Sequence, residues 1–184
     1  AIVCGNCFVL KPSERDPSAA LFVAQLLYEA GLPKGVLNVV NGGKEAVDTL
    51  LTDERVQAVS FVGSTAIAKY VYITATEHDK RCQALGGAKN HAIVMQDAEM
   101  ENTVNALIGA AFGSSGERCM SISVAVAVGS ETADNLIAGL KSKMHNLKVG
   151  NFDDSNNDFG PLITKDHMEK VKQYITSAEA QGAD

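Results

Sequence analysis

The alternation of β-rich runs with helical patterns along the whole chain is the feature that most constrains its fold. The runs expected to form strands lie at residues 36–40, 56–62, 81–85, 91–95 and 122–128. The segments with helical patterning lie at residues 44–51, from 63 onward, 100–112, 131–145 and 165–181. Such alternation is typical of α/β folds, in which a helix connects two parallel strands. We therefore expect open, largely parallel sheets with flanking helices.

The first helix has the clearest start and stop signals. In DPSAALFVAQLLYEAGLP, we expect Asp16 as the N-cap, Pro17 in the first turn, and Gly31 and Pro33 as stop signals. Ahead of this helix, AIVCGNCFVL has no charged segment before its apolar stretch, so we do not expect it to be a signal peptide. Its pattern is that of the inside of a strand, and we expect the chain to begin in mid-domain. Two β-α-β crossovers fit within the first 80 residues.

Composition limits the size of the fold and its partners. With 184 residues, 46% of them hydrophobic, the chain can bury one substantial core and forms one domain or parts of two. Its 16 basic and 22 acidic residues give a net charge of −6 without any basic block, so we expect no nucleic-acid partner. No apolar run reaches membrane-spanning length, so we expect no membrane association either.

The four cysteines have different surroundings in the sequence. They are scattered in apolar or glycine-rich segments, which indicates a reducing compartment rather than a disulfide framework. Cys4 and Cys7 have C-x-x-C spacing, but no second pair or histidine cluster follows, so we expect no metal or redox site there. Together with Cys82 they are interpreted as core residues. Cys119, in GSSGERCMSIS, is either a nucleophile or a small apolar residue, and residue type alone favours the second.

Two further segments carry weak signals of a ligand site. FVGST, at residues 61–65, is a strand that enters a helix through Gly-Ser, where free N–H groups attract an anion, although many such turns bind none. The G-x-G-x-x-G fingerprint is absent from the sequence. KPSER places Lys11 and Glu14 after a strand, where α/β folds bind ligands. Solvated charges at the start of a helix are the alternative for these two residues.

Five segments in order resemble the NAD-dependent aldehyde dehydrogenase superfamily: LKPSE, GLPKGVLNVVNG, FVGST, LGGAKN and GERC. The resemblance covers essentially the whole chain. Within the superfamily, QALGGAKNHAIVMQDA and GAAFGSSGERCMSIS are most similar to the coenzyme-A-dependent methylmalonate-semialdehyde dehydrogenase branch. This resemblance implies NAD-dependent oxidation of methylmalonate or malonate semialdehyde to propionyl-CoA or acetyl-CoA, with coenzyme A as co-substrate, as in valine catabolism.

The resemblance also implies roles for single residues. Cys119 falls on the family's nucleophile, and a thiolate there would add to an aldehyde, lose a hydride to NAD and hold the acyl group as a thioester. Arg118 is similar to the arginine that holds the substrate carboxylate, with a structural arginine as the alternative. The expected cofactor contacts, from the ribose to the pyrophosphate and the nicotinamide, are Lys11, Glu14, Arg15, Gly63, Ser64 and Gly86. No metal is expected.

One residue of the family pattern is missing. Hydrolytic members carry a glutamate just ahead of the glycine pair, as the general base for water. An alignment anchored on Lys89 and Asn90 puts Leu85 at that place, and an alignment on the glycines puts Ala84 there. Neither side chain accepts a proton, so we expect coenzyme A to release the acyl group.

The resemblance implies an interior segment of a longer enzyme. We expect residues 1–85 to be part of an NAD-binding domain and residues 86–184 part of a catalytic domain, inactive as an isolated chain. For the full-length protein we expect a homo-oligomer, a dimer or tetramer, in the cytoplasm of a bacterium or the mitochondrial matrix of a eukaryote. Two alternatives stay open: an aldehyde dehydrogenase that hydrolyses its thioester to a free acid, and a non-catalytic nucleotide-binding fragment.

Overall fold

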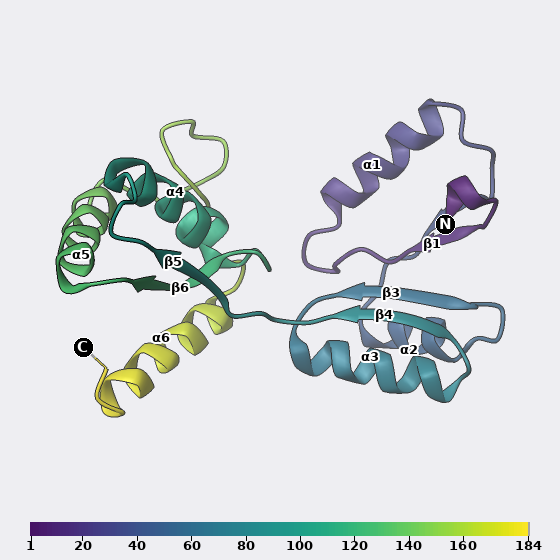
Figure 1. Ribbon diagram of the computed structural model, residues 1–184. Helices are drawn as coiled ribbons and strands as arrows, with labels where there is room; N and C mark the ends of the chain where they lie inside the picture. The colour runs from purple at the N-terminus through teal and green to yellow at the C-terminus, as the bar shows by residue number, and fades with distance from the viewer. Residues whose placement is uncertain (184) are drawn as a thin grey trace. The chain divides into compact units, whose positions relative to one another are not determined.

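The computed structural model describes residues 1–183, which form two compact units, the first spanning Ala1–Gly87 and the second beginning at Ala88 (Figure 1). The first contains η1 (Ile2–Cys4), β1 (Phe8–Leu10), α1 (Ser18–Glu29), β2 (Leu37–Val39), α2 (Lys44–Thr52), β3 (Ala58–Val62), α3 (Thr65–Glu77) and β4 (Arg81–Leu85). The second contains β5 (Asn90–Val94), α4 (Met100–Phe112), η2 (Gly113–Gly116), β6 (Ile122–Ala127), α5 (Ser130–Met144) and α6 (Lys165–Ala180).

The strands form three parallel pairs, each joined by a helical crossover. In the first unit β1 pairs with β2 across α1, and β3 pairs with β4 across α3. In the second unit β5 pairs with β6 across α4. The predicted α/β class with parallel sheets and flanking helices is therefore confirmed. Of the two crossovers expected within the first 80 residues, β1-α1-β2 forms, whereas β2 and β3 belong to different sheets and the second crossover, β3-α3-β4, ends at Leu85.

The core of the first unit lies between β3–β4 and the helices α2 and α3. Leu51, Val71 and Ala75 are buried there, and alternate residues of the two strands, Val59, Phe61, Cys82 and Ala84, pack against them. Cys82 is thus a core residue, as expected from the sequence. Burial raises the pKa of its thiol, because the charged thiolate is poorly solvated there.

The N-terminal segment differs from the prediction in two ways. Cys4 and Cys7 are exposed rather than buried, because a 3₁₀ turn and Gly5, at φ 81°, interrupt the segment and leave only Phe8–Leu10 as strand. The N-cap of α1 is Pro17 rather than Asp16. The Pro17 carbonyl already accepts the first helical hydrogen bond, from the backbone N–H of Leu21 at 2.9 Å, so Asp16 lies outside the helix.

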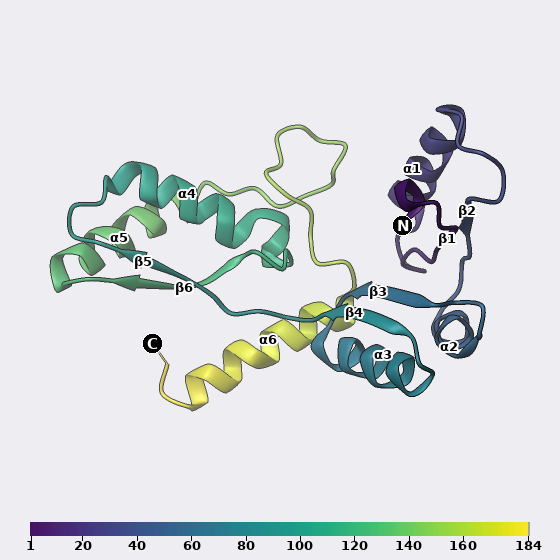
Figure 2. The same ribbon diagram turned by 45° about the vertical axis from the view of Figure 1, so that its right-hand side comes forward.

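The core of the second unit forms where α4 and α5 pack on β5–β6 (Figures 1 and 2). Its buried residues are Val94 from β5, Val104 and Leu107 from α4, and Leu136 from α5. The residues of β5 alternate between the covered and the open face of the sheet, and Ile93 is 70% exposed on the open face. Within residues 1–183, no helix is both long and apolar enough to span a membrane.

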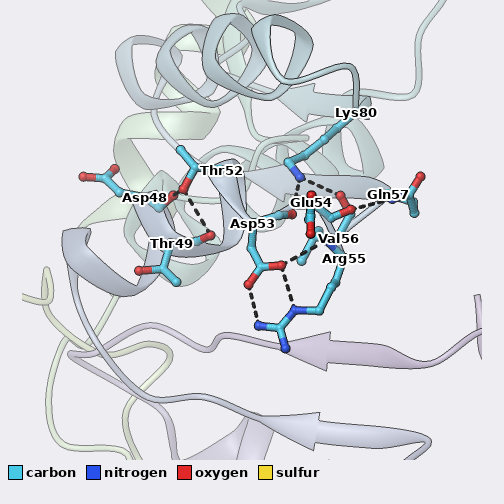
Figure 3. A network of polar contacts seen from close by, with 9 residues as sticks. All are labelled: Asp48, Thr49, Thr52, Asp53, Glu54, Arg55, Val56, Gln57 and Lys80. Atoms are coloured by element: carbon cyan, nitrogen blue, oxygen red, sulfur yellow. Dashed lines mark hydrogen bonds and ion pairs between the residues drawn. The ribbon is translucent and has the colours of Figure 1, made fainter.

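A buried lysine closes the loop between α2 and β3 (Figure 3). Lys80 is 6% exposed, and its ammonium group donates to the backbone carbonyls of Asp53, at 2.5 Å, and Val56, at 2.6 Å. The Asp53 carboxylate accepts from the Arg55 guanidinium at 2.6 and 2.9 Å. These hydrogen bonds from Arg55, followed by one from its backbone N–H, lower the pKa of Asp53. The network fixes the path of the chain into β3.

Replacing Lys80 by Met should destabilise the full-length protein by about 2–4 kcal/mol, because two carbonyls lose a charged donor in a buried place. The free energy of unfolding, measured in urea, checks this. Lys69→Met, at an exposed position of α3, is the control and should change that free energy by less than about 0.5 kcal/mol. Equal small effects of the two changes would show that the Lys80 contacts do not stabilise the fold.

Candidate active site

Lys11 and Glu14 lie together just beyond the end of β1. The ammonium group of Lys11 donates to the carbonyls of Pro12, at 2.5 Å, and Gly42, at 2.8 Å, and lies 3.6 Å from the Glu14 carboxylate. The carbonyl of Gly42 follows β2, so Lys11 joins the carboxyl ends of the paired strands. A hydrogen bond from its own backbone, followed by the charge of Lys11, lowers the pKa of Glu14. Arg15 is exposed beside them.

The turns after β3 and β4 meet at the start of α3. The backbone N–H of Gly63 donates to the Leu85 carbonyl at 3.1 Å, and that of Gly87 donates to Thr65 Oγ1 at 3.0 Å. A Cβ on Gly86 would lie 3.0 Å from the Thr65 Cα, so the loop after β4 passes very close to the helix. Ser64 is the N-cap of α3, and its side chain leaves the first N–H groups of this helix uncapped. This end of a helix favours an anion.

The loop between α4 and Cys119 has an unusual backbone. Ser114 and Ser115 have φ values of 55° and 54°, and Gly116 follows at 72°. Left-handed backbone costs about 1–2 kcal/mol per non-glycine residue, so other contacts must hold it. One contact is the hydrogen bond from the Ser115 hydroxyl to the Gly160 carbonyl, at 2.7 Å. Strained backbone of this kind clusters at active sites and ligand clamps.

Cys119 lies in a tight turn that closes this loop. The backbone N–H of Ser121 donates to the Arg118 carbonyl at 3.0 Å, and the side chain of Cys119 is exposed. The Asn90 side-chain amide donates to the Cys119 carbonyl at 2.9 Å. The turn precedes β6, so the thiol lies at the amino end of its sheet, whereas Lys11, Gly63 and Gly86 lie at carboxyl ends.

Glu117 and Arg118, with opposite charges, directly precede the cysteine. The Arg118 guanidinium packs so closely on Gly113, the C-cap of α4, that a Cβ there would lie 2.7 Å from its Nη1. A cation at that place is stabilised by the helix dipole. The Glu117 carboxylate lies 3.3 Å from the Nε2 of His167 on α6. Within residues 1–183, no cluster of three or more His, Cys, Asp or Glu side chains could hold a metal ion.

Sequence reasoning missed several contacts of the site. Asn90 served only to anchor an alignment, although its place at the start of β5, parallel to β6, puts it beside the cysteine turn. The contacts of Thr65 and Ser115 had no signal in the sequence, because they depend on how the loops close.

Leu85 and Ala84, which the two alternative alignments put at the place of the expected general base, differ in their surroundings. Leu85 is 52% exposed on the open face of β3–β4, whereas Ala84 packs into the core. Of these two residues, only Leu85 is therefore exposed on the face of the sheet away from α2 and α3.

Comparison with known proteins identifies the family. The sequence model of the aldehyde dehydrogenase family matches residues 1–184. The chain belongs to the aldehyde dehydrogenase family. It is 60% identical over 184 residues to malonate-semialdehyde dehydrogenase of Pseudomonas aeruginosa, covering all of this chain and 37% of that protein. The corresponding enzyme of Bacillus cytotoxicus is 57% identical over 183 residues, with the same coverage. The chain thus spans little more than a third of the length of these aldehyde dehydrogenases.

Solved aldehyde dehydrogenase structures agree with this assignment. Methylmalonate-semialdehyde dehydrogenase from Oceanimonas doudoroffii is 70% identical, with a TM-score of 0.95, over all of this chain and 38% of that one. A putative methylmalonate-semialdehyde dehydrogenase from Sinorhizobium meliloti, complexed with NAD, is 55% identical, also with a TM-score of 0.95, over all of this chain and 37% of that one. The resemblance to this branch of the aldehyde dehydrogenases is confirmed.

Proposed function

We propose that the full-length enzyme containing this chain oxidises malonate or methylmalonate semialdehyde with NAD, in the presence of coenzyme A. The products are acetyl-CoA or propionyl-CoA, CO₂ and NADH. The observation that carries the proposal is the exposed Cys119 thiol at a turn held by Asn90, in a chain whose relatives bear the malonate- and methylmalonate-semialdehyde dehydrogenase names. In this proposal the first unit belongs to the NAD-binding domain and the second to the catalytic domain.

The first unit has groups that fit a dinucleotide. The uncapped start of α3 can bind the pyrophosphate at the turn of Gly63 and Ser64, and Gly86 would approach the nicotinamide. Lys11 and Glu14 can hold ribose hydroxyls, one as donor and one as acceptor, with Arg15 beside them. Bound NAD supplies the hydride acceptor.

The chemistry of the second unit begins at Cys119. Its thiolate adds to the aldehyde carbon and forms a C–S bond, and the carbonyl oxygen becomes an oxyanion. When the hydride leaves that carbon, the C=O bond forms again and a thioester remains on the cysteine. Loss of CO₂ breaks the bond to the carboxylate carbon, and solvent supplies the proton that replaces it. The coenzyme A thiol then attacks the thioester and releases Cys119 as thiolate.

Replacing Gly86 by Val should raise KM for NAD by about tenfold, because a side chain there forces the loop after β4 away from Thr65 and the start of α3. Steady-state kinetics of the full-length enzyme check this. Gly109→Ala is the control, since a Cβ on Gly109 meets open space in α4, and its KM should stay within about twofold of the original. An unchanged KM in Gly86→Val would contradict the placement of the cofactor.

Replacing Arg118 by Ala tests the substrate class. If the guanidinium pairs with the substrate carboxylate, the transition-state stabilisation derived from kcat/KM should fall by about 2 kcal/mol or more for malonate semialdehyde. For propanal, kcat/KM should hardly change. Rates of NADH formation by the full-length enzyme with each aldehyde measure the difference. Equal losses for both aldehydes would mean that Arg118 supports the loop through its contact with Gly113, and the acid substrate would lose its support.

A further inference from the structure

We propose that Asn90 is a positioning residue for Cys119, because its side-chain amide clamps the turn that presents the thiol. The amide nitrogen donates to the carbonyl of Cys119 at 2.9 Å and to the carbonyl of Ser121 at 3.0 Å. The inference rests on the proposed function of Cys119 as the nucleophile.

The chemistry of the two partners fixes the orientation of the Asn90 amide. Both partners are backbone carbonyl oxygens, which only accept hydrogen bonds, so the NH₂ group must face them. Each of its two hydrogens serves one carbonyl. A carboxylate of the same shape has no hydrogen to give and would repel both oxygens. The site therefore requires a double donor at residue 90.

The clamp acts on the turn formed by residues 118–121. The Ser121 N–H closes this turn on the Arg118 carbonyl, and Asn90 holds the Cys119 and Ser121 carbonyls. Fixing the Cys119 carbonyl fixes rotation about the bond between its Cα and carbonyl carbon, and so the direction in which the turn presents the thiol. Ser121 is only 9% exposed, so the end of the turn is buried in the second unit, whereas Met120 within the turn is 78% exposed.

An irregularity in the sheet brings Asn90 to this place. Asn90 pairs with Ile122, but His91 pairs with Val124, so Ser123 is an extra residue in β6. Such a bulge bends its strand, and bulges next to active sites re-aim side chains. Here the irregularity lies at the first residue of β5, opposite the strand that follows the cysteine turn.

The first turnover of the full-length enzyme tests the inference. Mixed with substrate and NAD but no coenzyme A, each variant gives a rate constant for NADH formation and an amplitude that counts active sites. Asn90→Ala and Asn90→Asp should lower the rate constant roughly ten- to a hundredfold, because a misplaced nucleophile reacts slowly. The amplitude should stay near that of the original enzyme. Asn146→Ala, which also removes an amide bonded to a carbonyl in this unit, should match the original in both.

The outcomes separate positioning from stability. If the Asn90 variants keep the original rate constant and lose only amplitude, Asn90 merely stabilises the fold and the inference is wrong. If Asn90→Asp reacts faster than Asn90→Ala, filling space matters more than donating, which also overturns it. Should Asn90→Ala not fold, Asn90→Asp alone decides through its rate constant. A first turnover that persists in Cys119→Ala would instead overturn the proposed function.

Discussion

Replacing Cys119 by Ala in the full-length enzyme should lower kcat/KM for malonate semialdehyde by about 10⁴-fold or more. Without the thiol no covalent bond to the aldehyde carbon forms, and the hydride cannot leave from a thiohemiacetal. NAD binding should be unchanged, because the residues proposed to hold the cofactor lie in the other unit. Initial rates of NADH formation and NAD titration measure the two effects.

The chain supplies its own controls for this change. Cys4→Ala alters another exposed cysteine, and Cys82→Ala alters a core cysteine whose thiol pKa is raised by burial. Both variants should keep kcat/KM within about threefold of the original enzyme. If Cys119→Ala falls only as far as these controls, the nucleophile is another residue.

Without coenzyme A, the full-length enzyme should release about one equivalent of NADH per active site in a burst and then turn over slowly. Neither Leu85 nor Ala84 accepts a proton, and a positioned general base is worth about 10²- to 10⁴-fold for attack by water. The coenzyme A thiol is partly ionised near neutral pH and is a better nucleophile. Added coenzyme A should therefore restore fast turnover. Stopped-flow absorbance of NADH follows both phases.

Leu85→Glu is the matched gain-of-function variant. Leu85 is half exposed on the open face of β3–β4, so a carboxylate there remains solvated, and the slow hydrolytic phase should become faster. Ala84→Glu is the control: it buries a carboxylate in the core and should destabilise the protein instead. Fast release of free acid by the original enzyme without coenzyme A would contradict the proposed acceptor and support the hydrolytic alternative.

The sequence predicted most strands and helices because their signals are local, but not which strands pair. The runs at residues 56–62 and 81–85 and the helix between them were predicted one by one, and the structure pairs the two strands as β3–β4. The prediction was wrong for Cys4 and Cys7, where an apolar composition hid a turn at Gly5. Composition cannot distinguish a strand from an exposed turn in so short a segment.

The sequence could predict which residues belong to the candidate site, but not which contacts hold them in place. The family segments identify Cys119, yet nothing in GSSG predicts left-handed backbone at Ser114 and Ser115, since serine rarely adopts it. The role of Asn90 depends on a one-residue shift between β5 and β6, which only the register reveals. Lys80 gives no sequence signal of its burial either, because lysine is almost never buried.

The most direct measurement of the central claim is to find the acyl group on the protein. The full-length enzyme is mixed with malonate semialdehyde and NAD without coenzyme A, quenched in acid during the burst, digested and analysed by mass spectrometry. We predict a thioester-linked acyl group on the peptide that contains Cys119, removed when coenzyme A is added before the quench. An NADH burst that leaves this peptide unmodified, or an acyl group on Cys4, Cys7 or Cys82 instead, would contradict it.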